Sequence, residues 1–313
     1  MTRVAVVGAG MVGATTAARI AEALLCDSVA LIDVAGDLAR AMALDIGSSL
    51  PLLGSDTVLT GGESYEGASG ADVVVITAGR PRQPGQSRAD LLEGNGRIVA
   101  EVCAGVRSAA PDAVVIVVTN PLDEMTHLAW RVSGFPTDRV MGMAGGLDSA
   151  RLRFFLAGLA KVAPPEVEAM TLGSHGDTMV PLPGHATIAG RPAEEVLDGA
   201  TLQGAFERTR GGGAEIVALL RRGSAYYAPA SATHAMVRAI LEDRREVHPV
   251  CAYLTGQYGI EGAFVGVPAV LSRRGVEEVR ELELAPAELA DLRAAAEAVR
   301  AKCAELDEAL GLG

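Results

Sequence analysis

The stretch VAVVGAGMVGATTAARIAEALLCDSVALID, residues 4–33, decides the fold of this chain. It opens with a short apolar run and passes through the glycine turn Gly8–Gly13. It continues as an alanine-rich segment with apolar residues at helical spacing, and ends with a second apolar run that stops at Asp33. These runs predict a strand, a tight turn, a helix and a second strand. That order, ending on an acid, is typical of a dinucleotide-binding βαβ unit.

Each glycine of this turn has a physical role in such a unit. The first allows the turn, the second lets the backbone approach a phosphate, and the third lets helix and strand pack closely. The start of the helix offers free N–H groups and partial positive charge to a pyrophosphate. We therefore expect a cofactor to lie against Gly8, Gly10, Met11, Val12 and Gly13.

Asp33 lies twenty residues after Gly13 and selects among dinucleotides. A carboxylate at this place accepts hydrogen bonds from both ribose hydroxyls of an adenosine and repels a 2′-phosphate, which favours NAD over NADP. FAD proteins share this fingerprint and remain the alternative at this point.

Composition excludes several classes of function. The chain has 313 residues, is 49% hydrophobic and carries a formal net charge of −12, which argues against nucleic acid or an anionic membrane as a partner. No apolar run reaches about 18 residues, and the N-terminus runs directly into a strand without a signal peptide, so we expect a cytoplasmic protein. The four cysteines have no metal-binding spacing, which predicts free buried thiols in a reducing compartment and no metal: Cys26, Cys103, Cys251 and Cys303.

The rest of the chain divides at about residue 145. Before it, continuous apolar runs at 71–77 and 113–119, with helical patterns at 38–50 and 89–110, predict buried parallel strands covered by helices. After it the patterns are mixed, with helices expected at 147–160, 211–222 and 285–310, short strands at 168–172 and 186–190, and strands with a turn over 262–271. We predict an α/β protein: an N-terminal Rossmann doubly wound parallel sheet over 1–145, tightly packed on a C-terminal α+β substrate domain over 146–313.

In a doubly wound sheet the ligand lies at the carboxyl ends of the strands. The residues at or near those ends extend the expected cofactor site to Thr77, Ala78, Gly79, Val118 and Asn120. We also expect Asn95, in the predicted helix at 89–110, to belong to it.

Three arginines, Arg80, Arg82 and Arg88, follow one of these strands in the segment TAGRPRQPGQSRADLL, residues 77–92. Its glycine and prolines disfavour regular structure and indicate a mobile lid. An acidic protein that gathers positive charge beside its cofactor site indicates an anionic substrate. An ordinary surface loop with solvated charges is the alternative.

Two further elements can carry chemistry. Asp148 and Arg151 are three residues apart on a predicted helix and therefore share a face, where a plain surface ion pair is the alternative. His175 lies among small residues in GSHGD, residues 173–177, at a turn that would leave its ring accessible. Histidine exchanges a proton near neutral pH, so His175 is a candidate acid/base, with a purely structural role equally open.

Six segments in order together resemble the malate dehydrogenases of the lactate dehydrogenase-like group, and the similarity runs nearly end to end. They are GAGMVG with Asp33, TAGRPRQPGQSRADLL, VVTNPLDEMT, VMGMAGGLDSARLR, LGSHGDTMVPL, and RTRGGGAEIV followed by GSAYYAPASA.

The resemblance implies a role for each matching residue. His175 would be the acid/base for the substrate hydroxyl, and Asp148 would stabilise its protonated form. Arg151 would hold the substrate C1 carboxylate, Arg88 would polarise the reacting carbonyl, and Asn120 would bind the substrate oxygen and help hold the nicotinamide side of NAD.

Arg82 would decide the substrate. Similar lactate dehydrogenases carry glutamine at this place, whereas a dicarboxylate enclosed by a lid needs a cation for its second carboxylate. The resemblance thus implies reversible oxidation of (S)-malate to oxaloacetate, an activity of the tricarboxylic acid cycle. Lactate or another 2-hydroxy acid is the nearest alternative, and a non-catalytic NAD sensor is a third. The family forms dimers and tetramers, so we expect a homo-oligomer; the apolar helices at 38–50 and 152–159 can serve an interface or the monomer core equally well.

Overall fold

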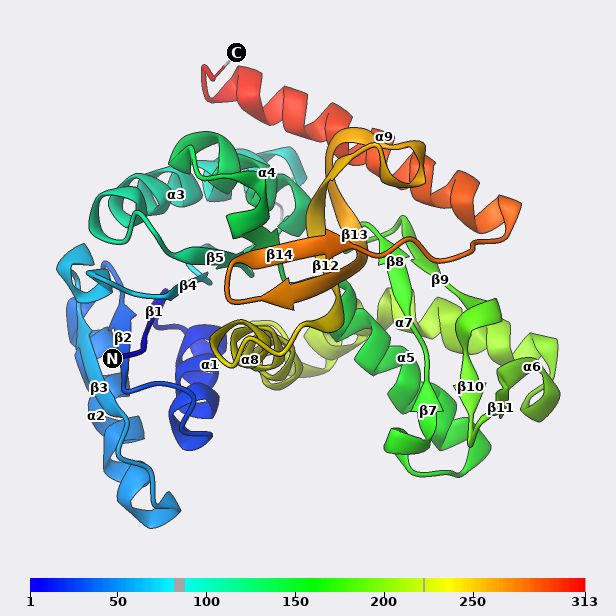
Figure 1. Cartoon of the computed structure of the whole chain (residues 1–313), viewed down its shortest axis with the longest axis horizontal. Helices are drawn as coiled ribbons and strands as arrows, with labels where there is room; N and C mark the ends of the chain where they lie inside the picture. Colours follow the sequence, from blue (N-terminus) through cyan, green and yellow to red (C-terminus); the bar gives the residue numbers. More distant parts are fainter. Residues whose placement is uncertain (82–87, 222, 313) are drawn as a thin grey trace.

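Parallel strands form the N-terminal half of the protein. In the computed structural model, which describes residues 1–81, 88–221 and 223–312, the first part of the chain builds a parallel sheet (Figure 1). Its strands lie in the spatial order β3 (Val58–Gly62), β2 (Ser28–Ile32), β1 (Arg3–Val7), β4 (Val73–Ile76), β5 (Val114–Val117) and β6 (Val140–Gly142). The strand order reverses between β1 and β4, where a doubly wound sheet opens its ligand crevice. The predicted doubly wound sheet is therefore confirmed.

Helices cover both faces of this sheet, as its uninterrupted apolar strands predict. The helices of this half are α1 (Met11–Glu22), α2 (Gly36–Leu53), α3 (Arg88–Ala109) and α4 (Leu122–Ser133). Along β1, Val4 and Val6 pack with residues of α1 and α2, whereas Ala5 and Val7 pack with residues of α3 and α4. In Figure 1, α3 and α4 lie above the strands and α1 below them. Alternate side chains of one strand thus feed two separate cores.

The C-terminal half extends the same sheet with antiparallel strands. They are β12 (Glu246–Thr255), β13 (Glu261–Ser272), β8 (Thr171–Gly173) and β9 (Met179–Pro181), with β14 (Gly275–Val279) paired to β13. A separate small sheet contains β7 (Val167–Glu168), β10 (Thr187–Ile188) and β11 (Arg191–Pro192). The helices of this half are α5 (Gly145–Ala160), α6 (Ala193–Val196), α7 (Gly199–Leu220), α8 (Tyr227–Leu241) and α9 (Pro286–Ala309).

The two halves share a sheet and a core. Gly142 of β6 pairs with Cys251 of β12, so the parallel part continues directly into the antiparallel part. Leu306 of α9 joins the core formed with α3 and α4, and Val237 of α8 joins the core formed with α1. This agrees with the tight packing expected from the absence of a linker.

Several elements differ from the sequence-based expectation. The predicted strands with a turn over 262–271 are wrong, because β13 is one long strand whose partner, β12, the apolar patterns do not reveal. The pattern of β12 is obscured by His248 and Pro249 within it. α7 begins at Gly199, well before the expected start at 211, because the glycines and polar residues of its first half hide the helical period. The edge strand β3 is poorly buried, and β6 is too short to stand out.

The four cysteines are all free and buried, as predicted. Among the helices that the structure describes, none combines the length and the apolar character needed to cross a membrane.

Candidate active site

The glycine turn forms a cradle whose three glycines differ in what they contact. Gly8 has φ +108°, and a Cβ there would lie 2.6 Å from Thr77 Oγ1; a Cβ on Gly13 would lie 1.8 Å from the Gly8 carbonyl oxygen. Internal packing therefore requires both. Gly10 adopts φ −68°, open to any residue, and a Cβ there would have no atom within 4 Å. The fold itself does not need glycine at this point, so the open space fits a ligand phosphate that approaches the backbone closely.

Asp33 lies at the end of β2 and is fastened to this cradle. Its carboxylate accepts hydrogen bonds from the Ala9 N–H at 2.7 Å and the Ala35 N–H at 2.9 Å. A carboxylate offers about four acceptor positions, so two remain for ribose hydroxyls. The donor set and the open cradle fit NAD.

A groove of about 650 Å³ runs from this cradle across the carboxyl ends of β4 and β5. It brings together most of the predicted cofactor residues: Gly10, Met11, Val12, Gly13, Thr77, Gly79, Asn95, Val118 and Asn120. Gly8, Ala78 and Asp33 do not line it. Its far wall was not predicted as cofactor site and includes Val217, Leu220 and Tyr226, which come from the end of α7 and the approach to α8. Val217 and Tyr226 lie in two of the segments that carry the resemblance, RTRGGGAEIV and GSAYYAPASA. Nothing in those segments points to a cofactor, because the role of these residues depends on where α7 packs.

Asn95 belongs to the groove but uses its side chain internally. Its amide donates to the Asn120 carbonyl at 2.6 Å and to the Arg80 carbonyl at 3.2 Å, and its carbonyl accepts from the Arg80 N–H at 2.8 Å. Asn95 thus ties the start of the arginine-rich segment to the backbone of Asn120.

Asp148, Arg151 and His175 meet around one buried carboxylate. Asp148 is 1% exposed; its Oδ2 lies 2.7 Å from His175 Nδ1 and its Oδ1 lies 3.1 Å from Arg151 Nη1. Because an ionised carboxylate only accepts, Nδ1 of His175 carries the proton in this contact. His175 Nε2 has no hydrogen-bond partner within residues 1–81, 88–221 and 223–312, so this nitrogen is available to exchange a proton. The His175 side chain is only 15% exposed, so its ring is less accessible than its position at a turn among small residues predicts.

The surroundings favour the charged form of His175. Burial lowers its pKa, but the charge and hydrogen bond of Asp148, with a further contribution from Asp123, outweigh burial and hold the pKa above its ordinary value. Stabilising the imidazolium in this way suits a group that accepts a proton during the reaction.

Asp123, on α4, contacts His175, although the sequence did not mark it as a candidate residue. Its Oδ2 accepts a hydrogen bond from the His175 backbone N–H at 2.9 Å. Burial and the charge of Glu124 raise the pKa of Asp123 to about 6. The sequence signal was present in NPLDEM, residues 120–125, where two consecutive acids lie in the first turn of a helix between apolar residues; both acids are buried.

The structure says little about Arg82 and Arg88, the two arginines of the predicted lid that were assigned to substrate binding. Arg82 lies outside the described residues, and Arg88 is described only as the first residue of α3. Arg80 lines the groove.

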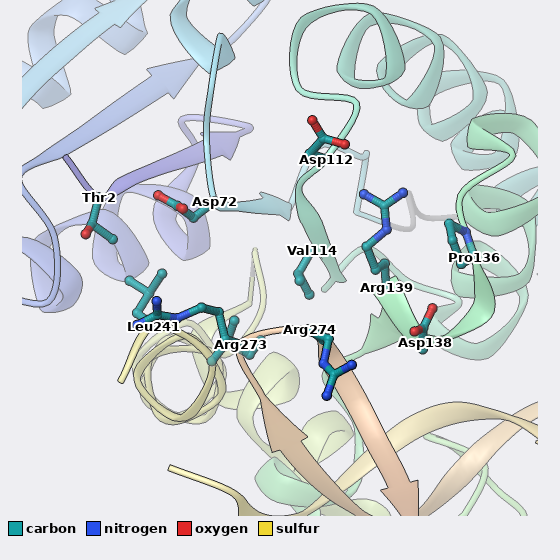
Figure 2. Close-up of a pocket in the computed structure, with 11 residues that line it drawn as sticks. Thr2, Asp72, Asp112, Val114, Pro136, Asp138, Arg139, Leu241, Arg273 and Arg274 are labelled. Carbon is teal, nitrogen blue, oxygen red and sulfur yellow. The ribbon is translucent and has the colours of Figure 1, made fainter. Parts of the chain in front are cut away.

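Another depression, of about 410 Å³, lies at the opposite edge of the sheet, where the parallel strands begin (Figure 2). Asp72, Asp112 and Asp138 line it together with Arg139, Arg273 and Arg274. Charges of both signs balance there, and none of the predicted site residues that the structure describes lines it. The cofactor groove, not this depression, is therefore the candidate site.

Known proteins resemble both halves of the chain. Residues 2–142 match the model for the NAD-binding domain of lactate/malate dehydrogenase, and residues 146–309 match the model for its alpha/beta C-terminal domain. A malate dehydrogenase of Nostoc punctiforme is 49% identical over 300 residues, which covers 96% of this chain and 91% of the relative. One from Thermomicrobium roseum is 49% identical over 298 residues, covering 95% and 96%.

Solved structures agree. Malate dehydrogenase from Salinibacter ruber superposes with a TM-score of 0.94 at 42% identity, covering 99% of this chain and 100% of the other. Lactate dehydrogenase from Cryptosporidium parvum, in complex with lactic acid and β-nicotinamide adenine dinucleotide, reaches 0.94 at 37% identity and covers 98% of each chain. Fold, cofactor cradle and end-to-end similarity lead to one conclusion: this chain belongs to the lactate/malate dehydrogenase family.

Proposed function

We propose that this protein is an NAD-dependent malate dehydrogenase that interconverts (S)-malate and oxaloacetate. The observation that carries the proposal is the shared carboxylate of Asp148, which holds His175 on one oxygen and Arg151 on the other. A proton acceptor and a carboxylate-binding cation are thereby set side by side in the family of enzymes that needs both.

In malate oxidation, neutral His175 accepts the hydroxyl proton at Nε2 while Asp148 binds Nδ1–H and stabilises the resulting imidazolium. Arg151 directs its free guanidinium donors at the C1 carboxylate and so orients the reacting carbon. Asn120, at the carboxyl end of β5, lines the groove where it can hydrogen-bond the substrate oxygen. Bound NAD supplies the hydride acceptor. Arg88 polarises the carbonyl in the reverse direction.

The substrate assignment depends on Arg82. Enclosing a dicarboxylate leaves its distal carboxylate without water, and an unpaired buried charge costs several kcal/mol, so a cation is needed there. Closing over pyruvate would instead leave Arg82 unpaired. Six curated relatives that are 45–49% identical to this chain are named malate dehydrogenases, which supports this assignment. The fold does not decide it, because a lactate dehydrogenase superposes equally well.

The test is NADH oxidation with oxaloacetate and with pyruvate, for the wild type and for Arg82→Gln. The wild type should prefer oxaloacetate by about a thousandfold or more, on the order of 4 kcal/mol, and the variant should move toward pyruvate. A wild-type preference for pyruvate would reject malate as the substrate. NADH binding without turnover of either acid would favour the sensor instead.

We further propose a domain boundary between residues 145 and 146, a homo-oligomer, either dimer or tetramer, and a cytoplasmic enzyme of the tricarboxylic acid cycle. The break between the two matched family models and the start of α5 at Gly145 support the boundary. Apolar side chains exposed on α2 and α5 support an oligomer, notably Leu44, Leu52 and Phe154. The four free thiols support a reducing compartment. Light scattering on the purified protein tests the oligomer directly.

A further inference from the structure

Three consecutive glycines, Gly211, Gly212 and Gly213, occupy the interior of α7. Each costs a helix about 1 kcal/mol relative to alanine, so the run needs a reason. The three glycines differ in what surrounds them in the structure. A Cβ on Gly211 or Gly213 would have no atom within 4 Å, whereas a Cβ on Gly212 would lie 2.9 Å from Arg151 Cδ and 3.4 Å from Arg151 Nε. Only Gly212 is buried, and its neighbour is the side chain proposed to bind substrate.

Arg151 has little freedom to move away from this contact. Its Nη1 is bound to Asp148, and its side chain is only 13% exposed. The Cδ atom lies in the middle of the side chain, so displacing it also swings the guanidinium. Arg151 Nε is buried and has no hydrogen-bond partner in the part of the chain that the structure describes. Arg151 is thus bound at Nη1 by the carboxylate, and its stem, from Cδ to Nε, lies beside the bare backbone of α7.

α7 is itself fastened against α5 beside the glycines. Phe155, one turn after Arg151, lies 3.9 Å from the position of a Gly212 Cβ. The Arg208 guanidinium lies over the Phe155 ring at 4.5 Å and makes two hydrogen bonds to Glu215, of 3.1 and 2.8 Å. Arg208 and Glu215 stand on either side of the glycine run, so moving α7 outward would disturb the packing on Phe155.

We propose that Gly212 is a positioning residue for substrate binding: its missing side chain lets α7 lie directly on the stem of Arg151 and aims the guanidinium at the substrate carboxylate. This inference rests on the role proposed above for Arg151. A methyl group at Gly212 requires Arg151 or α7 to shift by several tenths of an ångström, and misplacements approaching 1 Å cost about a hundredfold in rate.

The test compares Gly212→Ala with Gly211→Ala. Both variants add one methyl group to the same helix and improve helix propensity equally, but only the first meets Arg151. For Gly212→Ala we expect kcat/KM for oxaloacetate to fall at least tenfold, mainly through a higher KM, with the NADH Kd unchanged. For Gly211→Ala we expect both quantities within twofold of the wild type. Equal kinetics in the two variants, or loss of NADH binding in Gly212→Ala, would overturn the proposal.

A double-mutant cycle identifies the path of the effect. In an Arg151→Ala background, which removes Cδ and the guanidinium, Gly212→Ala should cause no further loss. A further tenfold loss there would mean that Gly212 acts on something other than Arg151. Failure of the proposed function would look different, because the wild type itself would then turn over pyruvate rather than oxaloacetate. The same comparison run with pyruvate would still test Gly212, since every 2-oxo acid carries the carboxylate that Arg151 would bind.

Discussion

Replacing Asp148 with asparagine keeps the size of the side chain but removes the charge that His175 and Arg151 share. In the wild type the Asp148 carboxylate accepts from His175 Nδ1 at 2.7 Å and from Arg151 Nη1 at 3.1 Å, in a site where Asp148 itself is 1% exposed. An asparagine has one acceptor oxygen, so it cannot satisfy both donors in the same way, and it can also turn its NH₂ group toward the ring.

The size of the effect follows from the contact that is lost. A hydrogen bond to a charged group contributes about 1.5–3 kcal/mol, and every 1.4 kcal/mol corresponds to about tenfold in rate. We therefore expect Asp148→Asn to lower kcat/KM for oxaloacetate reduction by about tenfold to a hundredfold near pH 7. The loss of orientation at Arg151 adds to this.

The pH dependence gives the sharper readout. The charge of Asp148 holds the pKa of His175 up against burial, so in the variant the pKa of His175 falls. Oxaloacetate reduction needs protonated His175 and is lost as pH rises through this pKa, so its profile should move to lower pH. Malate oxidation needs neutral His175, so its rising limb should move to lower pH as well.

The assay follows NADH absorbance in both directions from pH 5 to 9, with NADH affinity measured separately. Asp291→Asn, at an exposed position of α9, makes the same charge change away from the site and serves as the control. A variant that binds NADH, loses less than twofold in rate and keeps the wild-type pH profile would refute the role of Asp148 and the reasoning from its two contacts.

Three other predictions follow from the packing and the charges. Gly10→Ala should leave Tm unchanged, because no protein atom is near its Cβ, and should weaken NADH binding at least tenfold; unchanged affinity would place the pyrophosphate elsewhere. On folding, the pKa of Asp123 rises from 3.8 to about 6, so ionisation of this carboxyl destabilises the wild type as pH increases through that range. The free energy of unfolding of Asp123→Asn, measured relative to the wild type, should therefore be about 3 kcal/mol more favourable to the variant at pH 8 than at pH 4. A difference between the two proteins in urea unfolding that does not change with pH would contradict this. On α3, Gly94→Ala should raise Tm, whereas Gly96→Ala should lower it, because only the latter methyl would meet Leu306, at 2.8 Å; equal shifts would mean that α9 yields freely.

The first thirty-three residues show how much of the structure a local sequence pattern can predict. Strand, turn, helix and acid contact one another within that segment, so composition and spacing sufficed to predict the cradle, its three glycines and the position of Asp33 at the end of a strand. The same holds for α5, where Asp148 and Arg151 share a face because of helical geometry alone. The resemblance added the substrate and the roles, which no periodicity contains.

The tertiary structure decided what distant segments do together. The sequence left a structural role and an acid/base role for His175 equally open. Only the packing of β8 and α5 brings its ring within 2.7 Å of Asp148, which supports the acid/base role that we propose. The buried Asp123, the pairing of β12 with β13, and the need for glycine at position 212 likewise depend on contacts between elements far apart in the sequence. A local pattern records which face of an element is apolar, but not which element packs on that face or at what distance. The distances that orient a guanidinium or raise a pKa must be set to within a few tenths of an ångström, and they are set only when the whole chain packs.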